Sequence, residues 1–417
     1  MTEDSTEKTF EALAGEPEDA QEARNGLRHM AALSLSKLSD GLIDPKLVLS
    51  WLLTGLGAPA VFVGALVPIR EAGALLPQLG LAAVLGRMAQ RRWMWVAGSA
   101  VQGLAAIVIA LAVAMLQGWQ AGLAVCAALA VLAVARAACS VSHKDILGKT
   151  VGNTRRGSVT GFAGSVSAAG VFVFALLLLS GLMQDQVAVI WAVALAGLLW
   201  LAAAAVLSRL SEPDSDVQAP GARPEYLSIL RRDAQLRRFI VVRGLLVVTA
   251  LAPPYFVVIA GQAGAGGLDQ LGGLVLASSA AAFLSSYVWG RLSDRSSRLV
   301  LILSGLVAAG AMLGAVGLDR AGLAGGWAIP GVLFVQMIAY HGVRQGRSTY
   351  LVDMAPEDGR AAYAALANTV IGVLLLLVGA LGGALSFVGA PVVLLVFAAL
   401  SVAGGLWALG LHEVEKP

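Results

Sequence analysis

The stretch Gly290-Arg-Leu-Ser-Asp294-Arg-Ser-Ser-Arg298 is a short basic segment between two long apolar runs. The runs cover residues 268–290 and 299–318. Each is long enough to cross the hydrocarbon of a bilayer as a helix, which takes about 20 residues. A basic turn between two such runs predicts a helical hairpin whose turn is cytoplasmic, because Lys and Arg are retained on that side of the membrane.

Similar apolar runs recur along the whole chain. Apolar residues make up 58% of it and charged residues 13%, whereas soluble domains are about half apolar and a quarter charged. The sequence therefore predicts an all-α membrane protein with about twelve transmembrane helices, and closely abutting runs leave eleven or thirteen open. The runs are 47–69, 70–86, 94–116, 121–142, 158–182, 187–207, 239–260, 268–290, 299–318, 328–346, 361–384 and 390–411.

The distribution of basic residues predicts the orientation. Most of the 29 Lys and Arg residues fall in segments that share one side of the membrane if the N-terminus is inside. Both tails, 1–46 and 412–417, are then cytoplasmic, in a multi-pass membrane protein. Residues 1–26 are polar and predict a disordered tail. The apolar spacing from Leu27 to Ile43 predicts a short helix on the inner membrane surface.

The longest polar interior segment, residues 208–238, divides the runs into six and six. This predicts two six-helix bundles, at 47–207 and 239–411. A repeat supports the division, because Gly86-Arg-Met-Ala-Gln90-Arg-Arg92 follows the second run as Gly290–Arg298 follows the eighth.

The pattern Gly-Arg-Leu-x-Asp-Arg-x-x-Arg after an even-numbered helix resembles the loop motif of the major facilitator superfamily (MFS). Helix count, halves and motif position extend the resemblance over nearly the whole chain, although Gln90 stands where the family usually has Asp. Residues Val67–Gln78 are similar to a bacterial branch of the family, which implies a location in the bacterial inner membrane. The resemblance implies a central cavity that opens alternately to each side. The motif residues are Gly86, Arg87, Gln90, Gly290, Arg291, Asp294, Arg295 and Arg298.

Polar residues inside the apolar runs are candidates for the cavity, because ionisable groups are costly in hydrocarbon. Arg136 either lines the cavity or extends to the inner headgroups. Gln336, Tyr340 and Arg344 are spaced four apart and share one helix face, although Arg344 could instead end its helix at the cytoplasm. Two further candidates for substrate binding are Asn368 and Gln78.

Two residues are candidates for ion coupling. Glu71 follows Arg70 at the expected outer junction of the first two runs, where the pair is either structural or contains a proton-coupling carboxylate. His341 could titrate near neutral pH, or it could be a buried structural histidine.

Motifs for other chemistry are absent from the sequence. It has no phosphate-binding Gly-x-x-x-x-Gly-Lys loop, His-Glu-x-x-His pair or Gly-x-Ser-x-Gly elbow. We therefore expect no enzyme activity, metal, cofactor or nucleic acid. A secondary transporter for a small solute is favoured, with proton coupling, although uniport stays open. The cationic residues Arg136 and Arg344 favour an anionic solute, and a monomer is expected. The alternative is a membrane scaffold or assembly factor on the same fold.

Asp294 is also a candidate for a conformational latch. A carboxylate there could cap the N-terminus of a neighbouring helix. The family resemblance implies that this loop contacts the opposite bundle in the outward-open state, so the expected partner is the start of the fifth run, near Ser158, which would be released when the cavity opens inward. Gln90 carries no charge, so the latch would be asymmetric. The alternative is that Asp294 pairs with an arginine of its own loop.

Overall fold

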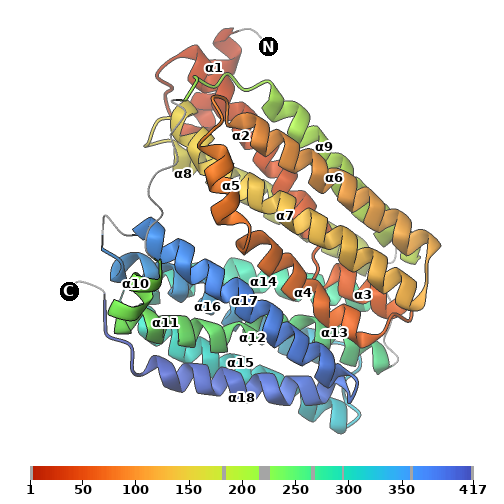
Figure 1. Ribbon diagram of the computed structural model, residues 1–417. Coiled ribbons are helices and arrows are strands. Elements are labelled where there is room, and N and C mark those ends of the chain that lie inside the picture. The colour runs from red at the N-terminus through yellow and green to blue at the C-terminus, as the bar shows by residue number, and fades with distance from the viewer. Residues whose placement is uncertain are drawn as a thin grey trace.

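The computed structural model describes residues 3–180, 185–215, 226–263, 268–293, 295–356 and 360–414, and all their regular secondary structure is helical. Figure 1 shows two groups of helices, one above the other. The first half contains α1 (Glu3–Ala14), α2 (Ala20–Leu42), α3 (Val48–Gly55), α4 (Ala60–Leu75), α5 (Gln78–Leu85), α6 (Arg92–Met115), α7 (Gly118–Thr150), α8 (Arg156–Leu179) and α9 (Gln186–Ser208).

The second half contains α10 to α18. It starts with the short α10 (Tyr226–Arg232), and its remaining helices are α11 (Ala234–Leu246), α12 (Val248–Leu251), α13 (Pro253–Gln262), α14 (Leu268–Ser293), α15 (Ser297–Arg320), α16 (Ala328–Met354), α17 (Arg360–Ser386) and α18 (Ala390–Ala408). If α2 with α3, α4 with α5, and α11 to α13 each count as one crossing, the described helices make twelve crossings.

The first crossing differs from the sequence prediction. Residues 20–42 form one helix, α2, which packs against α8 and α9 instead of lying on the membrane surface. Gly41 meets Val171 of α8, and the Trp200 indole of α9 donates to Ser36 at 3.1 Å. Residues 3–14 are also helical, so the prediction of a disordered tail over residues 1–26 was wrong for the described part. The polar residues of α2 lower its apolar content, so it does not stand out as an apolar run. Other helices, rather than lipid, cover it.

The first outer turn also differs from the prediction. It lies at residues 56–59, where Gly57 has a φ of +68° and Pro59 precedes α4. Glycine tolerates this left-handed backbone, and proline starts a helix without losing a hydrogen bond. The sequence prediction had placed the junction at 69–70. Arg70 and Glu71 therefore lie inside α4 rather than at an outer junction.

Both halves use the same packing pattern. The pairs α6–α7, α6–α9, α2–α9 and α4–α7 of the first half correspond to α15–α16, α15–α18, α11–α18 and α14–α16 of the second. Glycines bring the backbones close at equivalent places: a Cβ on Gly103 would lie 2.7 Å from the Gly197 carbonyl oxygen, and one on Gly305 would lie 3.2 Å from Gly405 Cα. Small residues allow such close contacts between helices in membranes. The equivalent contacts show that the two halves are internal repeats in structure as well as in sequence.

The halves meet mainly through the helix pairs α4–α17, α8–α14 and α3–α13, and α4 also contacts α12 and α13 while α3 contacts α14. Pro68 of α4 fits against Gly379 of α17, and the Tyr255 hydroxyl of α13 fits against Gly64 of α4. Farther along the same interface, the Asn368 amide of α17 donates to Gln78 Oε1 at 3.5 Å. These contacts place α4 directly against the second half.

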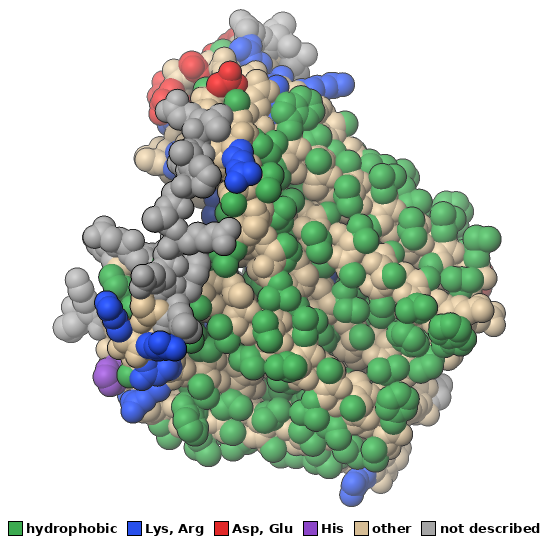
Figure 2. Space-filling model, in the orientation of Figure 1, with side chains coloured by type: hydrophobic (Ala, Val, Ile, Leu, Met, Phe, Trp, Pro, Cys, Tyr) green, Lys and Arg blue, Asp and Glu red, His purple; other side chains and the backbone are tan. Residues whose placement is uncertain are grey.

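The outer surface is apolar. Nine described helical segments are long and apolar enough to cross a membrane by length and composition. Large side chains such as Phe283 (79% exposed) and Trp191 (70%) face outward. Figure 2 shows hydrophobic side chains over most of the visible face, with most of the Lys and Arg side chains in view along its upper and left margins. This surface suits lipid, which solvates apolar side chains.

Candidate functional site

A small cavity lies between the two halves. Its volume is about 20 Å³, enough for about one water molecule. Side chains from α4, α11, α12, α16 and α17 and from residue 247 line it, and they are Glu71, Leu75, Arg243, Leu246, Val247, Thr249, Ala250, Tyr340, Val343, Arg344, Arg347 and Leu375. Because both halves supply its walls, a change in their relative position would change its size and access.

Three arginines of the second half face this cavity. Arg243 of α11 is 6% exposed, donates to Asn368 Oδ1 at 2.9 Å, and has a buried Nε without a partner in the described part of the chain. Arg344 of α16 is exposed and Arg347 is half-buried. None of the three forms an ion pair with a described carboxylate. This wall of the cavity is therefore strongly positive.

Lys46 connects the two halves. Its ammonium group lies 3.3 Å from Glu71 Oε1 in the first half and donates to the Tyr340 hydroxyl of the second at 3.1 Å. It also lies 4.4 Å from the centre of the Tyr340 ring, within the range of a cation–π contact. Glu71 is close enough to Arg347 for an electrostatic interaction. The bridge and the arginines thus belong to one site.

An ion-pair cluster of the first half lies beside this site. Asp40 of α2 accepts from Arg70 of α4 at 2.6 Å and, through its other oxygen, from Arg136 of α7. One carboxylate thus holds two guanidinium groups on different helices. Charges in a low-dielectric interior are stable only when paired and hydrogen-bonded, so this cluster holds α2, α4 and α7 of the first half together.

The first crossing is interrupted beside the cluster. Pro45 has no backbone N–H and disfavours a helical residue before it. The Asp44 carboxylate accepts from the backbone N–H of Lys46 at 2.9 Å, and its carbonyl accepts from Leu47, Val48 and Leu49. The chain therefore turns between α2 and α3 and directs Lys46 toward the cavity. In the second half, Pro253 and Pro254 begin α13 within the corresponding crossing. Interrupted helices at equivalent positions mark binding sites in transporters.

The predicted site residues are only partly brought together. Tyr340, Arg344 and Glu71 line the cavity, and the hydrogen bond between Asn368 and Gln78 joins α17 to the start of α5. Arg136 is paired with Asp40. The remaining two, Gln336 and His341, are discussed next.

Gln336 and His341 lie outside the cavity lining. Gln336 is fully buried within the second half and donates to the Thr249 carbonyl at 3.0 Å, so it does not line this cavity, and its part in solute binding stays a prediction. His341 packs against Tyr340 with ring centres 5.1 Å apart, and its buried Nε2 has no described partner.

Sequence reasoning missed five residues. Four of them, Lys37, Asp40, Asp44 and Lys46, belong to a segment that was assigned to the N-terminal tail, and the fifth, Arg347, was assigned to the inner loop that follows the tenth run. The available signal was the helical spacing from Leu27 to Ile43 followed by Pro45. The charged side chains of the site are then seven basic and three acidic ones: Lys37, Lys46, Arg70, Arg136, Arg243, Arg344 and Arg347, with Asp40, Asp44 and Glu71.

The loop-motif residues pair mainly within their own halves. In the first half, Arg87 is exposed, Gln90 donates to Asp214 at 3.2 Å, and Gly86 caps α5. In the second, Arg298 pairs with Glu413 at 2.9 Å. Gly290 lies in α14, and Arg291 and Arg295 are exposed.

Asp294 lies outside the described residues, so the latch stays a prediction. The arginines at the start of the fifth run have partners in their own half. Arg155 pairs with Glu18 and Glu22, and Arg156 donates to the Val151 carbonyl.

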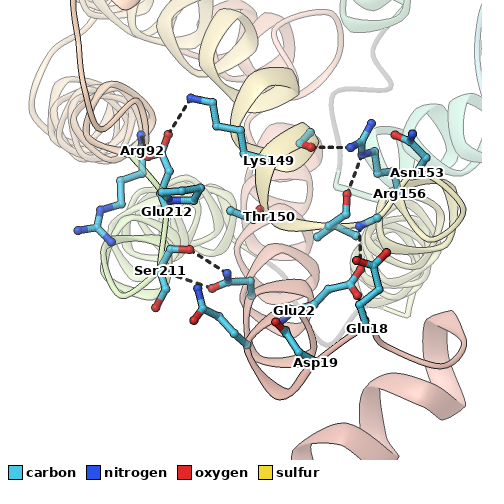
Figure 3. Close-up of a pocket in the computed structure, with 16 residues that line it drawn as sticks. Glu18, Asp19, Glu22, Arg92, Lys149, Thr150, Asn153, Arg156, Ser211 and Glu212 are labelled. Carbon is cyan, nitrogen blue, oxygen red and sulfur yellow. Dashed lines mark hydrogen bonds and ion pairs between the residues drawn. The ribbon is translucent and has the colours of Figure 1, made fainter. Parts of the chain in front are cut away.

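A larger polar pocket, of about 580 Å³, lies at one end of the first half. Figure 3 shows its side chains, which come from the start of α2, the start of α6, the end of α7, the start of α8 and the segment after α9. Glu212 accepts from the backbone N–H groups of Arg91 and Arg92 at the start of α6. All its described walls belong to one half, so it moves with that half and is separate from the cavity between the halves.

Comparison with solved structures decides the fold. A POT family transporter in complex with a thioalcohol-conjugated peptide superposes with a TM-score of 0.70 at 12% identity, covering 97% of this chain and 98% of the other. The D-xylose–proton symporter superposes with a TM-score of 0.68 at 11% identity, covering 94% of this chain and 98% of the other. The chain has the major facilitator fold. The nucleoside transporter NupG also matches, with a TM-score of 0.67 at 12% identity over 93% and 98% of the two chains.

The major facilitator fold confirms the prediction from the loop motif, including an all-α membrane protein of about twelve helices in two bundles. No protein-family model matches the sequence, and no curated protein does either. At this low identity the likeness extends to the fold alone.

Proposed function

We propose that this protein is a secondary transporter that moves a small anionic solute by alternating access, with Glu71 as the proton-coupling group. The observation that carries the proposal is the arginine wall of the cavity, formed by Arg243, Arg344 and Arg347. Three guanidinium groups without a described ion-pair partner need an anion to neutralise them. Guanidinium binds carboxylate and phosphate through two parallel hydrogen bonds.

The distribution of charge supports binding from the second half. The acids at the site belong to the first half, where Asp40 and Glu71 already have basic partners. An incoming anion would complete the site by joining the arginines of the second half to Lys46 of the first. Closure of the cavity around the anion would then bury paired charges rather than unpaired ones, which lowers the free-energy cost of the conformational change.

The Lys46 bridge suggests how a proton could be coupled to the solute. When Glu71 is ionised, it neutralises Lys46 at 3.3 Å. A proton on Glu71 would remove that negative charge and leave Lys46 free to attract an anion. By thermodynamic reciprocity, a bound anion would favour protonation of Glu71 to the same degree. Proton and anion would therefore travel in the same direction.

A flux measurement with the purified protein in proteoliposomes tests this function. We expect saturable uptake of labelled carboxylates or phosphate esters, increased by a more acidic outer compartment, and no uptake of a neutral sugar or an organic cation. In Glu71→Gln, acid-driven accumulation should be lost, while exchange of labelled for unlabelled anion should persist. Uptake of neutral solutes without uptake of any anion would contradict the proposal, and absence of all flux would favour the scaffold alternative.

The orientation is a separate prediction. Both termini and residues 208–238 are expected in the cytoplasm because most basic residues lie on that side. Reporter fusions after residues 185, 263 and 388 should be active outside, and a fusion after residue 90 should be active inside. An inside signal at any of the first three positions would reject this topology.

A further inference from the structure

An apolar groove runs along the outer surface of the first half. Its volume is about 660 Å³, and side chains of α5, the following loop, α6 and α7 line it. The lining residues are Leu81, Met88, Trp93, Met94, Ala97, Gly98, Val101, Ala130, Val131, Val134, Ala135 and Ala138. The groove lies away from the cavity between the halves, and the proposed transport function does not use it.

Small residues make this surface hollow. On the floor, a Cβ on Gly98 would lie 2.8 Å from the Ala135 carbonyl oxygen, so α6 and α7 lie almost in contact there. Alanines occupy four of the other positions. Leu81 and Met88 form one side, and Val131 and Val134 project with exposed fractions of 52% and 47%. From Trp93 to Val101 the groove follows α6 for roughly 12 Å at 1.5 Å per residue, close to the half-thickness of a hydrocarbon core of about 30 Å.

One end of the groove is basic and aromatic. Trp93 is 46% exposed, and the Arg92 guanidinium lies 5.2 Å from the centre of its ring. Arg87 is exposed and precedes Met88 in the loop. Arg91 is occupied by its ion pair with Asp145, whereas Arg92 forms no ion pair with a described carboxylate. Its Nη2 donates to Gln90 Oε1 at 2.9 Å, and its buried Nε has no described partner. Tryptophan prefers the membrane–water interface, so this end lies at headgroup level.

We propose that this groove binds one anionic phospholipid of the leaflet at the basic end, with an acyl chain along α6 and α7 and the phosphate group at Arg87 and Arg92. The acyl chain matches the groove in length and polarity. Two arginines beside an interfacial tryptophan complement a headgroup with net negative charge better than a zwitterionic one, because no described acid neutralises them.

Competition between lipids in native mass spectrometry tests the site. The detergent-purified protein is mixed with equal amounts of phosphatidylglycerol and phosphatidylcholine that carry the same acyl chains. We expect phosphatidylglycerol adducts to exceed phosphatidylcholine adducts several-fold, at about fivefold per arginine near the headgroup. The preference should disappear in Arg87→Gln/Arg92→Gln, which leaves the Arg91–Asp145 ion pair in place.

Two further variants separate the headgroup from the groove. Ala97→Leu fills the groove from an exposed position and should reduce binding of both lipids while keeping their ratio. Arg320→Gln, at the far end of α15, should change neither the amount of bound lipid nor the ratio of the two lipids. If the double variant does not fold, Arg87→Gln alone can be measured instead. It alters one exposed side chain and should halve the logarithm of the preference for phosphatidylglycerol. Equal binding of the two lipids by the unchanged protein, or an unchanged preference in the arginine variants, would overturn the proposal.

Discussion

Replacing Arg347 with Gln is expected to raise the KM for an anionic solute about 10- to 100-fold, because a hydrogen bond to a charged group contributes about 1.5–3 kcal/mol. The protein should still fold. Arg347 lines the cavity without a described ion-pair partner, so its removal leaves no buried carboxylate unpaired. The measurement is the concentration dependence of initial uptake in proteoliposomes, at matched protein content.

Two controls define this result. Arg347→Lys keeps the charge but loses the planar fork of donors, so it should recover part of the affinity and not all of it. Arg320→Gln removes an exposed arginine at the far end of α15 and should leave KM unchanged. A KM for Arg347→Gln within twofold of the unchanged protein would remove the arginine wall from solute binding.

Replacing Asp40 with Asn should have a larger effect, on folding itself. The substitution leaves Arg70 and Arg136 facing each other with no counter-charge, 13% and 34% exposed as side chains. Breaking a buried ion pair by removing one partner costs about 3–5 kcal/mol. We expect the melting temperature in detergent to fall by roughly 3–6 °C, with loss of the monodisperse peak in size-exclusion chromatography.

Arg136→Gln is the matched comparison for Asp40→Asn. It removes one guanidinium but keeps the Arg70–Asp40 pair at 2.6 Å, so it should be much less destabilising. If both variants melt at the same temperature as the unchanged protein, Asp40 does not hold the three helices together.

The architecture could be predicted from sequence because lipid imposes a simple rule. Each apolar run of sufficient length becomes a helix, and ten of the twelve predicted runs coincide with a helix or helix group of the structure. The rule failed in residues 1–86. There, Lys37 and Asp40 lower the apolar content of α2, although this helix is covered by α8 and α9. The turn at Gly57 was overlooked because no charged residue marks it.

The site was harder to predict than the fold. Helical spacing correctly grouped Tyr340 with Arg344, since residues four apart share a face whatever lies opposite. Spacing within one helix cannot show what a neighbouring helix presents, so the bridge from Lys46 to Tyr340 could not be predicted. For the same reason Gln336 was assigned to the cavity, although its amide is bound to the Thr249 carbonyl inside the second half.

The polar character of α2 also affects how the protein is made. A helix with Arg24, Arg28, Lys37 and Asp40 does not partition into lipid by itself, because each charge near the bilayer centre costs about 2.5–3.5 kcal/mol on insertion scales. Its packing partners α8 and α9 are synthesised much later, at residues 156–208. The insertion machinery therefore has to hold the first helix at the membrane until these partners emerge from the ribosome. In a nascent chain that ends before α8, α2 would have no partner to bury its charges. It would then stay outside the membrane, where quality-control proteases can reach it.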